Sequence, residues 1–171
     1  MNALAKAFTT YHPYNLQYPT YITIDGKQVH GKWVVGNYVQ SRHYYQDNEI
    51  VHAVFTSDCR HDCGGTYTNA GWYEVLPESI CWYTGMVDKN NERIYTNCIV
   101  KIDGCTTGYG TNQDLAIVAY LQQECGFVLI LPNGDRRLGH RGSDSSYFID
   151  TRLEVVGDIF SNPELVKEVR E

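Results

Sequence analysis

The stretch that decides the fold, residues 74–101, reads EVLPESICWYTGMVDKNNERIYTNCIVK. Two apolar runs rich in aromatic and β-branched residues flank a polar segment, which is the pattern of a strand, a turn and a second strand. The polar segment groups no residues that demand a particular chemistry. The stretch therefore predicts sheet architecture and says little about activity.

Length and composition indicate one globular domain, or one domain with a small appendage. A chain of 171 residues is long enough to bury a core without staples. Its hydrophobic share of 43% and charged share of 20% are typical of globular proteins. The 14 tyrosines and 3 tryptophans suit half-buried β surfaces. We interpret them mainly as a strand-rich core, and otherwise as a binding surface.

Charge and hydropathy narrow the class of protein. The net charge of -6 disfavours a general nucleic-acid coat, which needs a basic footprint. No apolar run approaches the roughly 20 residues of a membrane span, and residues 1–10 show no secretory signal. We expect a soluble cytoplasmic protein with no membrane partner. In that reducing compartment the six cysteines should be thiols or metal ligands rather than disulfides.

The first half of the chain predicts a β hairpin. Residues 21–24 and 33–40 are strand-like, and Asp25-Gly26 between them supplies the positive φ of a type I′ turn. Gly31 indicates that the pairing is irregular. Residues 49–56 are apolar on both faces and predict a strand buried on two sides.

The second half adds further strands and a helix. Residues 115–121 fit a helix or a buried strand by pattern alone, and the β-rich run at 127–131 favours a strand pair that returns near Arg137. Other strands are expected at 72–76, 80–83, 99–102 and 153–160. Asn162 and Pro163 predict the start of a helix. Its apolar face must dock on the body, because so short a helix is marginal alone; that face consists of Leu165, Val166 and Val169.

Several motifs carry a family likeness. They are Gly31-Lys32-Trp33-Val34-Val35-Gly36, Tyr83-Thr84-Gly85, Asp88-Lys89-Asn90, Ile94-Tyr95, Ile99-Val100, and residues 154–160 with the Asn162-Pro163-Glu164-Leu165 that follows. Together they resemble the YopX family of phage and prophage proteins over residues 25–168. The resemblance implies a phage origin and a mainly β fold, and it discloses no activity.

We therefore expect a mainly β fold, either a small barrel or packed antiparallel sheets, with an N-terminal β hairpin extension and a short C-terminal helix. Residues 1–72 are expected to form an N-terminal β extension packed on the body. Residues 73–171 are expected to form the YopX-like β domain with the C-terminal helix.

Two departures from the family pattern concern turn residues. Asn91 stands where the family usually has glycine, and Thr96-Asn97-Cys98 stands where it tends to have Glu-Gly-Asp. Asparagine is the next best residue for a left-handed position, so the first turn should survive. Since the second change removes two carboxylates, these positions should serve turn geometry rather than chemistry.

A metal site is one candidate. Cys59, His61 and Cys63 place two thiols and an imidazole in one short loop, and Cys98 with Cys105 could supply a second half-site. Structural zinc takes four nitrogen or sulfur ligands. The spacing is looser than that of a zinc knuckle, so we favour unligated thiols and no cofactor, with a zinc-stabilised protein as an alternative.

A binding surface is the other candidate. Its residues are Arg42, Tyr44, Tyr45, Arg136, Arg137, His140 and Arg141. Arginine forks suit phosphates or carboxylates, and a cation beside aromatic rings can stack on bases. A charged hairpin tip explains the same residues, and the acidic net charge weakens the nucleic-acid interpretation.

No catalytic motif stands out. His140, Ser143 and Asp144 are the residue types of a hydrolytic triad, but sequence proximity is poor evidence, since triads are assembled from separate elements. We therefore expect a phage accessory protein that is not an enzyme and that binds a protein partner or itself through β surfaces rich in Tyr and Trp. A nucleic-acid-binding protein is an alternative.

Overall fold

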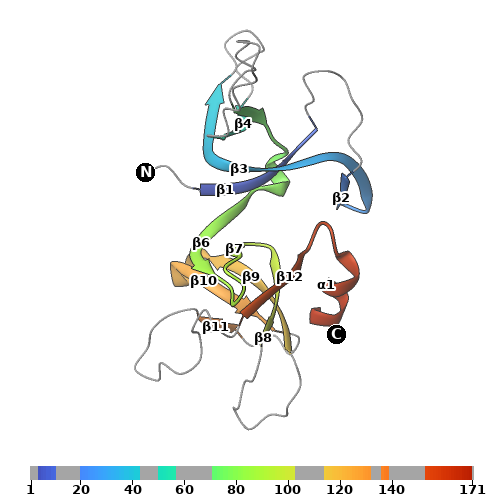
Figure 1. Cartoon of the computed structure of the whole chain (residues 1–171), viewed down its shortest axis with the longest axis vertical. Helices are drawn as coiled ribbons and strands as arrows, with labels where there is room; N and C mark the ends of the chain where they lie inside the picture. The colour runs from blue at the N-terminus through green and yellow to red at the C-terminus, as the bar shows by residue number, and fades with distance from the viewer. Residues whose placement is uncertain are drawn as a thin grey trace. The chain divides into compact units, whose positions relative to one another are not determined.

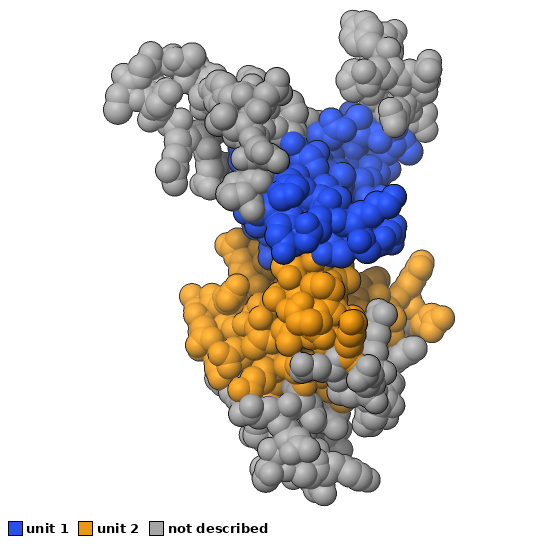
Figure 2. Space-filling view, turned by 90° about the vertical axis from the view of Figure 1, so that its right-hand side faces the viewer, with its two compact units in different colours: residues 1–82 blue, residues 83–171 orange. Residues whose placement is uncertain are grey.

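The computed structural model describes residues 4–10, 20–42, 50–56, 71–102, 114–131, 136–138 and 153–170. The chain divides into two compact units, Met1–Trp82 and Tyr83–Glu171, coloured blue and orange in Figure 2. The boundary at 72 and 73 that the sequence indicates for the domains stays a prediction.

The fold is mainly β, as predicted, with two antiparallel sheets and one short C-terminal helix (Figure 1). The first sheet has the order β5-β4-β3-β1-β6-β7 with β2 paired to β3, and the second has the order β11-β10-β9-β8-β12. Of the two predicted architectures, the described strands form the antiparallel sheets and close no barrel. The strands are β1 Leu4–Thr9, β2 Thr20–Ile24, β3 Lys27–Arg42, β4 Ile50–Phe55, β5 Trp72–Glu74, β6 Cys81–Val87, β7 Arg93–Tyr95, β8 Cys98–Ile102, β9 Asp114–Leu121, β10 Gly126–Ile130, β11 Arg136–Leu138 and β12 Leu153–Asp158.

The predicted N-terminal hairpin is present. Ile24 of β2 pairs with Lys27 of β3, which leaves a two-residue turn. Asp25 and Gly26 in that turn have φ values of 48° and 73°. Positive φ at both central residues is what a type I′ turn requires. The local Asp-Gly signal therefore sets the hairpin, but its second arm is residues 27–31; the predicted partner, residues 33–40, pairs with β1 and β4 instead.

β3 is the longest strand and pairs with three others. It pairs with β2 up to Gly31, with β1 from Lys32 to Asn37, and with β4 from Asn37 onward. Two glycines stand near these changes of partner. A Cβ on Gly31 would lie 2.2 Å from the carbonyl oxygen of Thr9, and one on Gly36 would lie 2.1 Å from that of Phe55. The glycines thus permit the close backbone approach of β1 and β4.

A core cluster of the first unit lies on one face of this sheet, and on the other face Phe8 and Ala53 are also fully buried. A buried cluster joins Ala7, Val34, Val54 and Val75, and Tyr73 and Ile80 pack against it. Since side chains alternate along a strand, the residues next to Val34 and Val54 in sequence belong to the opposite face.

The prediction that β4 is buried on both faces is confirmed only at Ala53 and Val54, which are adjacent and therefore point to opposite faces of the sheet. Ala53 and Val54 are buried, but Ile50 and Phe55 at the two ends are 49% and 45% exposed. Only the middle of β4 carries a side chain, that of Val54, into the core cluster. The apolar residues on both faces of β4 therefore form part of an exposed apolar surface as well as part of the core.

The second unit contains the sheet that the apolar runs of the second half predict. The ambiguous run at 115–121 is the strand β9, which pairs with β10, and β10 pairs with β11 where the return near Arg137 was expected. The 3₁₀ turn η2, Gln122–Glu124, joins β9 to β10 and ends at Cys125 with φ 47°. These three elements confirm the strand-pair interpretation over the helical one.

The predicted C-terminal helix is α1, Pro163–Arg170. The carbonyl oxygen of Asn162 accepts the N–H of Leu165 at 3.1 Å, which begins the first turn. The side chain of Val169 is buried with Ile99 of β8 and Ile117 of β9, and Leu165 and Val166 pack against this cluster. The apolar face that the sequence shows is therefore the docking face.

Candidate functional site

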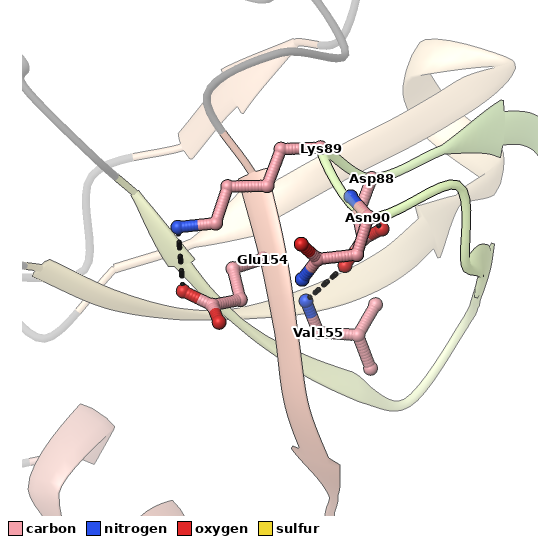
Figure 3. A network of polar contacts seen from close by, with 5 residues as sticks. All are labelled: Asp88, Lys89, Asn90, Glu154 and Val155. Atoms are coloured by element: carbon pink, nitrogen blue, oxygen red, sulfur yellow. Dashed lines mark hydrogen bonds and ion pairs between the residues drawn. The ribbon is translucent and has the colours of Figure 1, made fainter.

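The carboxylate of Asp88, at the turn between β6 and β7, connects its own turn to a distant strand (Figure 3). Its Oδ1 accepts the backbone N–H groups of Asn90 and Glu92, each at 2.8 Å. Its Oδ2 accepts the N–H of Val155 in β12 at 2.9 Å. The same carboxylate thus closes its own turn and holds a strand that is distant in sequence.

The electrostatics of Asp88 follow from this geometry. The residue is only 4% exposed, and burial raises the pKa of a carboxyl group. The N–H donors of Val155, Glu92 and Asn90, with the ammonium of Lys89, outweigh burial and hold the pKa of Asp88 below its ordinary value. Asp88 is therefore an ionised acceptor at neutral pH, and its oxygens are engaged by backbone donors.

The same turn covers part of the outer edge of β12. In the second sheet β12 is an edge strand whose partner is β8. On its other side, the N–H of Lys89 donates to the carbonyl oxygen of Leu153 at 2.9 Å, next to the bond from Val155 to Asp88. Lys89 Nζ also lies 2.7 Å from Glu154 Oε2, as Figure 3 shows. The exposed edge of a sheet can pair with a strand of another chain, and this motif covers part of such an edge on β12.

Asn91 and Asn97, the asparagines at the two turns, both have left-handed backbones. Asn91 has φ 65° and Asn97 has φ 67°. The N–H of Asn97 donates to Val118 at 2.7 Å, and its carbonyl oxygen accepts the N–H of Ile159 at 3.0 Å. These positions hold turns in place, as the departures from the family pattern predict.

Asp158, at the end of β12, is a second buried carboxylate with a structural role. Its Oδ1 accepts the N–H groups of Phe160 and Ser161 at 3.1 and 2.8 Å. Its Oδ2 accepts the Ser161 hydroxyl at 3.2 Å. Asp158 thus shapes the turn into α1, much as Asp88 shapes the turn into β7.

An apolar surface lies on the face of the first sheet opposite the core cluster. Val35 and Val39 of β3 point to this face, and Phe55 of β4 joins them, since it pairs with Asn37 between them. Val35 is 39% exposed, Val39 36% and Phe55 45%. Diagonal cross-strand neighbours lie about 7–8 Å apart, so the three side chains are contiguous around Asn37. We call them the apolar stripe.

Two opposite charges flank the apolar stripe on the same face. Lys6 of β1 pairs with Val35, and its ammonium lies 4.4 Å from the ring centre of Trp33. Glu74 of β5 pairs with Ala53, which in turn pairs with Val39. Lys6 and Glu74 therefore lie at opposite ends of the stripe.

Most tyrosines and tryptophans whose side chains are described pack against other rings. Tyr38 meets Trp82 edge-on with ring centres 5.0 Å apart, and burial raises the pKa of Tyr38. Tyr83 and Tyr95 have ring centres 5.6 Å apart. Tyr21 and Tyr120 are exposed. The exposed stripe is therefore built from valine and phenylalanine rather than from the tyrosine and tryptophan that composition favours.

The residues predicted for binding fall partly within the structure. Arg42 ends β3 in the first sheet, whereas Arg136 and Arg137 begin β11 in the second. The structure thus places Arg42 on one sheet and Arg136 and Arg137 on the other. Tyr44, Tyr45, His140 and Arg141 lie outside the described residues. The nucleic-acid alternative stays a prediction.

The residues predicted for zinc, Cys59, His61 and Cys63, also lie outside the described residues, as do Cys105 and the triad-like Ser143 and Asp144. Cys98, from the second half-site, is a buried residue at the start of β8. Across the described ranges no group of three His, Cys, Asp or Glu side chains could hold a metal ion. The zinc alternative therefore stays a prediction too.

A small apolar cavity lies inside the second unit. Its volume is about 10 Å³, which is about the space that a single water molecule needs. Its walls are apolar, so it offers a ligand neither room nor polar contacts. The lining residues are Met86, Ile94, Val118, Phe127, Val128, Leu129 and Leu153.

Sequence reasoning missed the apolar stripe for a physical reason. Trp33, Val34 and Val35 are consecutive and apolar, so β3 shows no alternation that separates a buried face from an exposed one. The cross-strand partners decide which face is covered. The available signal was the run of apolar residues on both faces of β3 and β4.

Comparison with known proteins places this architecture in a family of phage-type proteins. The family model described as YopX protein matches residues 24–167, and this chain belongs to the YopX family. The match covers most of the chain, including both motifs around Asp88 and β12. No curated protein matches the chain. Among the described residues, no helix is long and apolar enough to cross a membrane.

Proposed function

We propose that this chain is a phage accessory protein that is not an enzyme and that binds a protein through the apolar stripe, in the cytoplasm of the host cell. Family membership supports the phage context. The carrying observation is that Val35, Val39 and Phe55 are contiguous on one face of the first sheet and are between 36% and 45% exposed. Contiguous apolar patches mark surfaces that another protein covers when they exceed a few hundred Å², and this stripe is the start of such a patch.

The non-enzymatic part of the proposal rests on how the buried carboxylates are used. Asp88 and Asp158 are the buried acidic residues of the described chain. A general base must have an oxygen available to a substrate proton. In both residues each carboxylate oxygen accepts at least one hydrogen bond from the protein, so both act as acceptors that shape turns.

The test compares two serine variants on the same strand. Phe55→Ser removes the centre of the apolar stripe, whereas Ile50→Ser removes a residue of similar exposure, 49%, whose register places it on the other face of β4. Each purified protein is immobilised and exposed to host lysate, and retained proteins are identified, purified and mixed again with the chain. A size measurement of each variant alone, by light scattering, runs in parallel.

We expect the wild type and Ile50→Ser to form the same complex, with a partner or with themselves, and Phe55→Ser to lose it. Equal melting temperatures for the two variants would show that the loss is not unfolding. A wild type that forms no complex of either kind, or a complex that survives Phe55→Ser unchanged, would overturn the proposal.

A further inference from the structure

The charges around the apolar stripe indicate what covers it. On this face the described charged residues nearest to the stripe are one cation, Lys6, and one anion, Glu74. A surface for a polyanion would show clustered cations, and one for a strongly basic partner would show clustered acids. One positive and one negative side chain at opposite ends of an apolar patch instead complement a rotated copy of the same patch, because the cation of each copy then faces the anion of the other.

We propose that the occupant of the apolar stripe is a second copy of this chain, related by a twofold axis. The inference rests on the proposed function, because it names the partner for the same surface. Twofold dimers are the commonest oligomers, and their interfaces are self-complementary: where residue i meets residue j, j also meets i.

The strand register locates the axis. Lys6 lies on β1, next to β3, and pairs directly with Val35. Glu74 lies on β5, two strands from β3 on the other side, and is level with Val39 through Ala53. The midpoint between them falls in the row of Asn37 and Phe55, between β3 and β4. A twofold axis through this point, parallel to the sheet and perpendicular to the line from Lys6 to Glu74, brings Lys6 of each copy onto Glu74 of the other, and the two stripes cross at Phe55.

Each element of the surface has a role in this arrangement. Phe55 lies beside the axis, so it meets its own counterpart and buries the most apolar area. Asn37 is exposed beside it and can exchange side-chain hydrogen bonds with the Asn37 of the second copy. The ring of Trp33 under the ammonium holds Lys6 on this face. The two ion pairs set the orientation of the copies more than their affinity.

The experiment uses charge reversal. Lys6→Glu, Glu74→Lys and the double variant are compared with the wild type by sedimentation velocity over a range of concentrations. Each single reversal places like charges opposite each other twice in the dimer, and we expect it to weaken dimerisation about tenfold at low salt. The double variant recreates both pairs with exchanged signs, so it should dimerise like the wild type. Melting temperatures of all four proteins control for folding.

The outcomes separate the two proposals. Recovery of the dimer in the double variant supports the inference, because damage to the fold by either single change would not be repaired by the other. A monomeric wild type that still captures a defined partner through Phe55 would overturn the second copy and leave the proposed function standing. A dimer that tolerates both single reversals and Phe55→Ser would overturn the inference as well, since its interface would lie elsewhere.

Discussion

A single carboxylate, that of Asp88, accounts for the Asp-Lys-Asn motif in physical terms. Two oxygens accept three backbone N–H groups, two from the turn and one from β12. Hydrogen bonds to a charged group contribute about 1.5–3 kcal/mol each to stability, and buried donors left unpaired cost about as much. The motif thus has a structural role in this fold.

The first prediction concerns the charge of Asp88. Asp88→Asn keeps the size of the side chain but replaces one acceptor oxygen by an amide donor, so either the N–H of Val155 or the two N–H groups of the turn lose their acceptor. We expect the free energy of unfolding to fall by about 2 kcal/mol, measured by urea denaturation. Glu154→Gln, which changes the partly exposed pair with Lys89, is the control and should cost less than about 1 kcal/mol. Equal losses in the two variants would contradict this assignment.

The second prediction is a pH dependence. Because the pKa of Asp88 is lower in the folded protein than its ordinary value, its stabilising contribution is complete at neutral pH and is lost as pH falls through the folded pKa. The difference in unfolding free energy between the wild type and Asp88→Asn should therefore shrink as pH falls below about 4. Denaturation series across acidic pH measure this difference, and a constant gap would show that the charge is not involved.

The third prediction concerns the left-handed turn at Asn91, where φ is 65°. Asn91→Gly restores the usual family residue and should leave stability within about 0.5 kcal/mol of the wild type, because glycine adopts this conformation without strain. Asn91→Ala should cost about 1 kcal/mol, since a Cβ without a local hydrogen bond disfavours the left-handed region. Thermal melts of the two variants give the order; an alanine variant as stable as the glycine one would contradict it.

At the scale of elements, the helix α1 shows how an apolar face becomes a contact. Val169 is 1% exposed against Ile99 and Ile117, while Lys167 on the same helix is exposed. We expect Val169→Ala to lower the free energy of unfolding by about 2 kcal/mol through lost burial and a cavity, and Lys167→Ala to change it by less than about 0.5 kcal/mol. Chemical denaturation compares the two, and similar losses would mean that α1 does not dock through Val169.

The elements that the sequence predicts are those with local signals. Asp25-Gly26 specifies its hairpin through backbone conformation alone, and Asn162-Pro163 marks the start of α1. β1 carries no such signal: its Ala and Lys residues are poor strand formers, and it is a strand because β3 and β6 flank it. In β1, pairing with neighbouring strands therefore outweighs the low strand propensity of its residues.

The candidate surface could not be predicted for a related reason. Lys6 and Glu74 are far apart in sequence and share a face only through the register that runs from β1 across β3 and β4 to β5. Register depends on long-range pairing, and a slip of one residue would move either charge to the other face. The Arg- and Cys-based predictions relied on proximity in sequence, which carries no such information.

At the scale of the whole molecule, the chain consists of two compact units. The Asp88 network belongs wholly to the second, and the apolar stripe wholly to the first. Stability in proteins is distributed over locally cooperative regions. We therefore expect structural and binding roles to be separable by mutation.

The fifth prediction tests this separation by amide hydrogen exchange. Asp88→Asn should speed exchange either in β12 or in the turn before β7, because the amide nitrogen replaces one of the two oxygens that accept their N–H groups. Exchange in β1, β3 and β4 should match that of the wild type. Faster exchange spread evenly over both units would show that the chain opens as one cooperative body.

The bonds that Asp88 and Lys89 make to β12 have a consequence for aggregation. Where the outer N–H and C=O groups of a strand already have partners, a further chain cannot pair, so the Leu153–Val155 part of this border is closed to fibre growth. Replacing Asp88 would remove that protection as well as stability. Any assembly this protein forms would then have to compete with strand-by-strand aggregation.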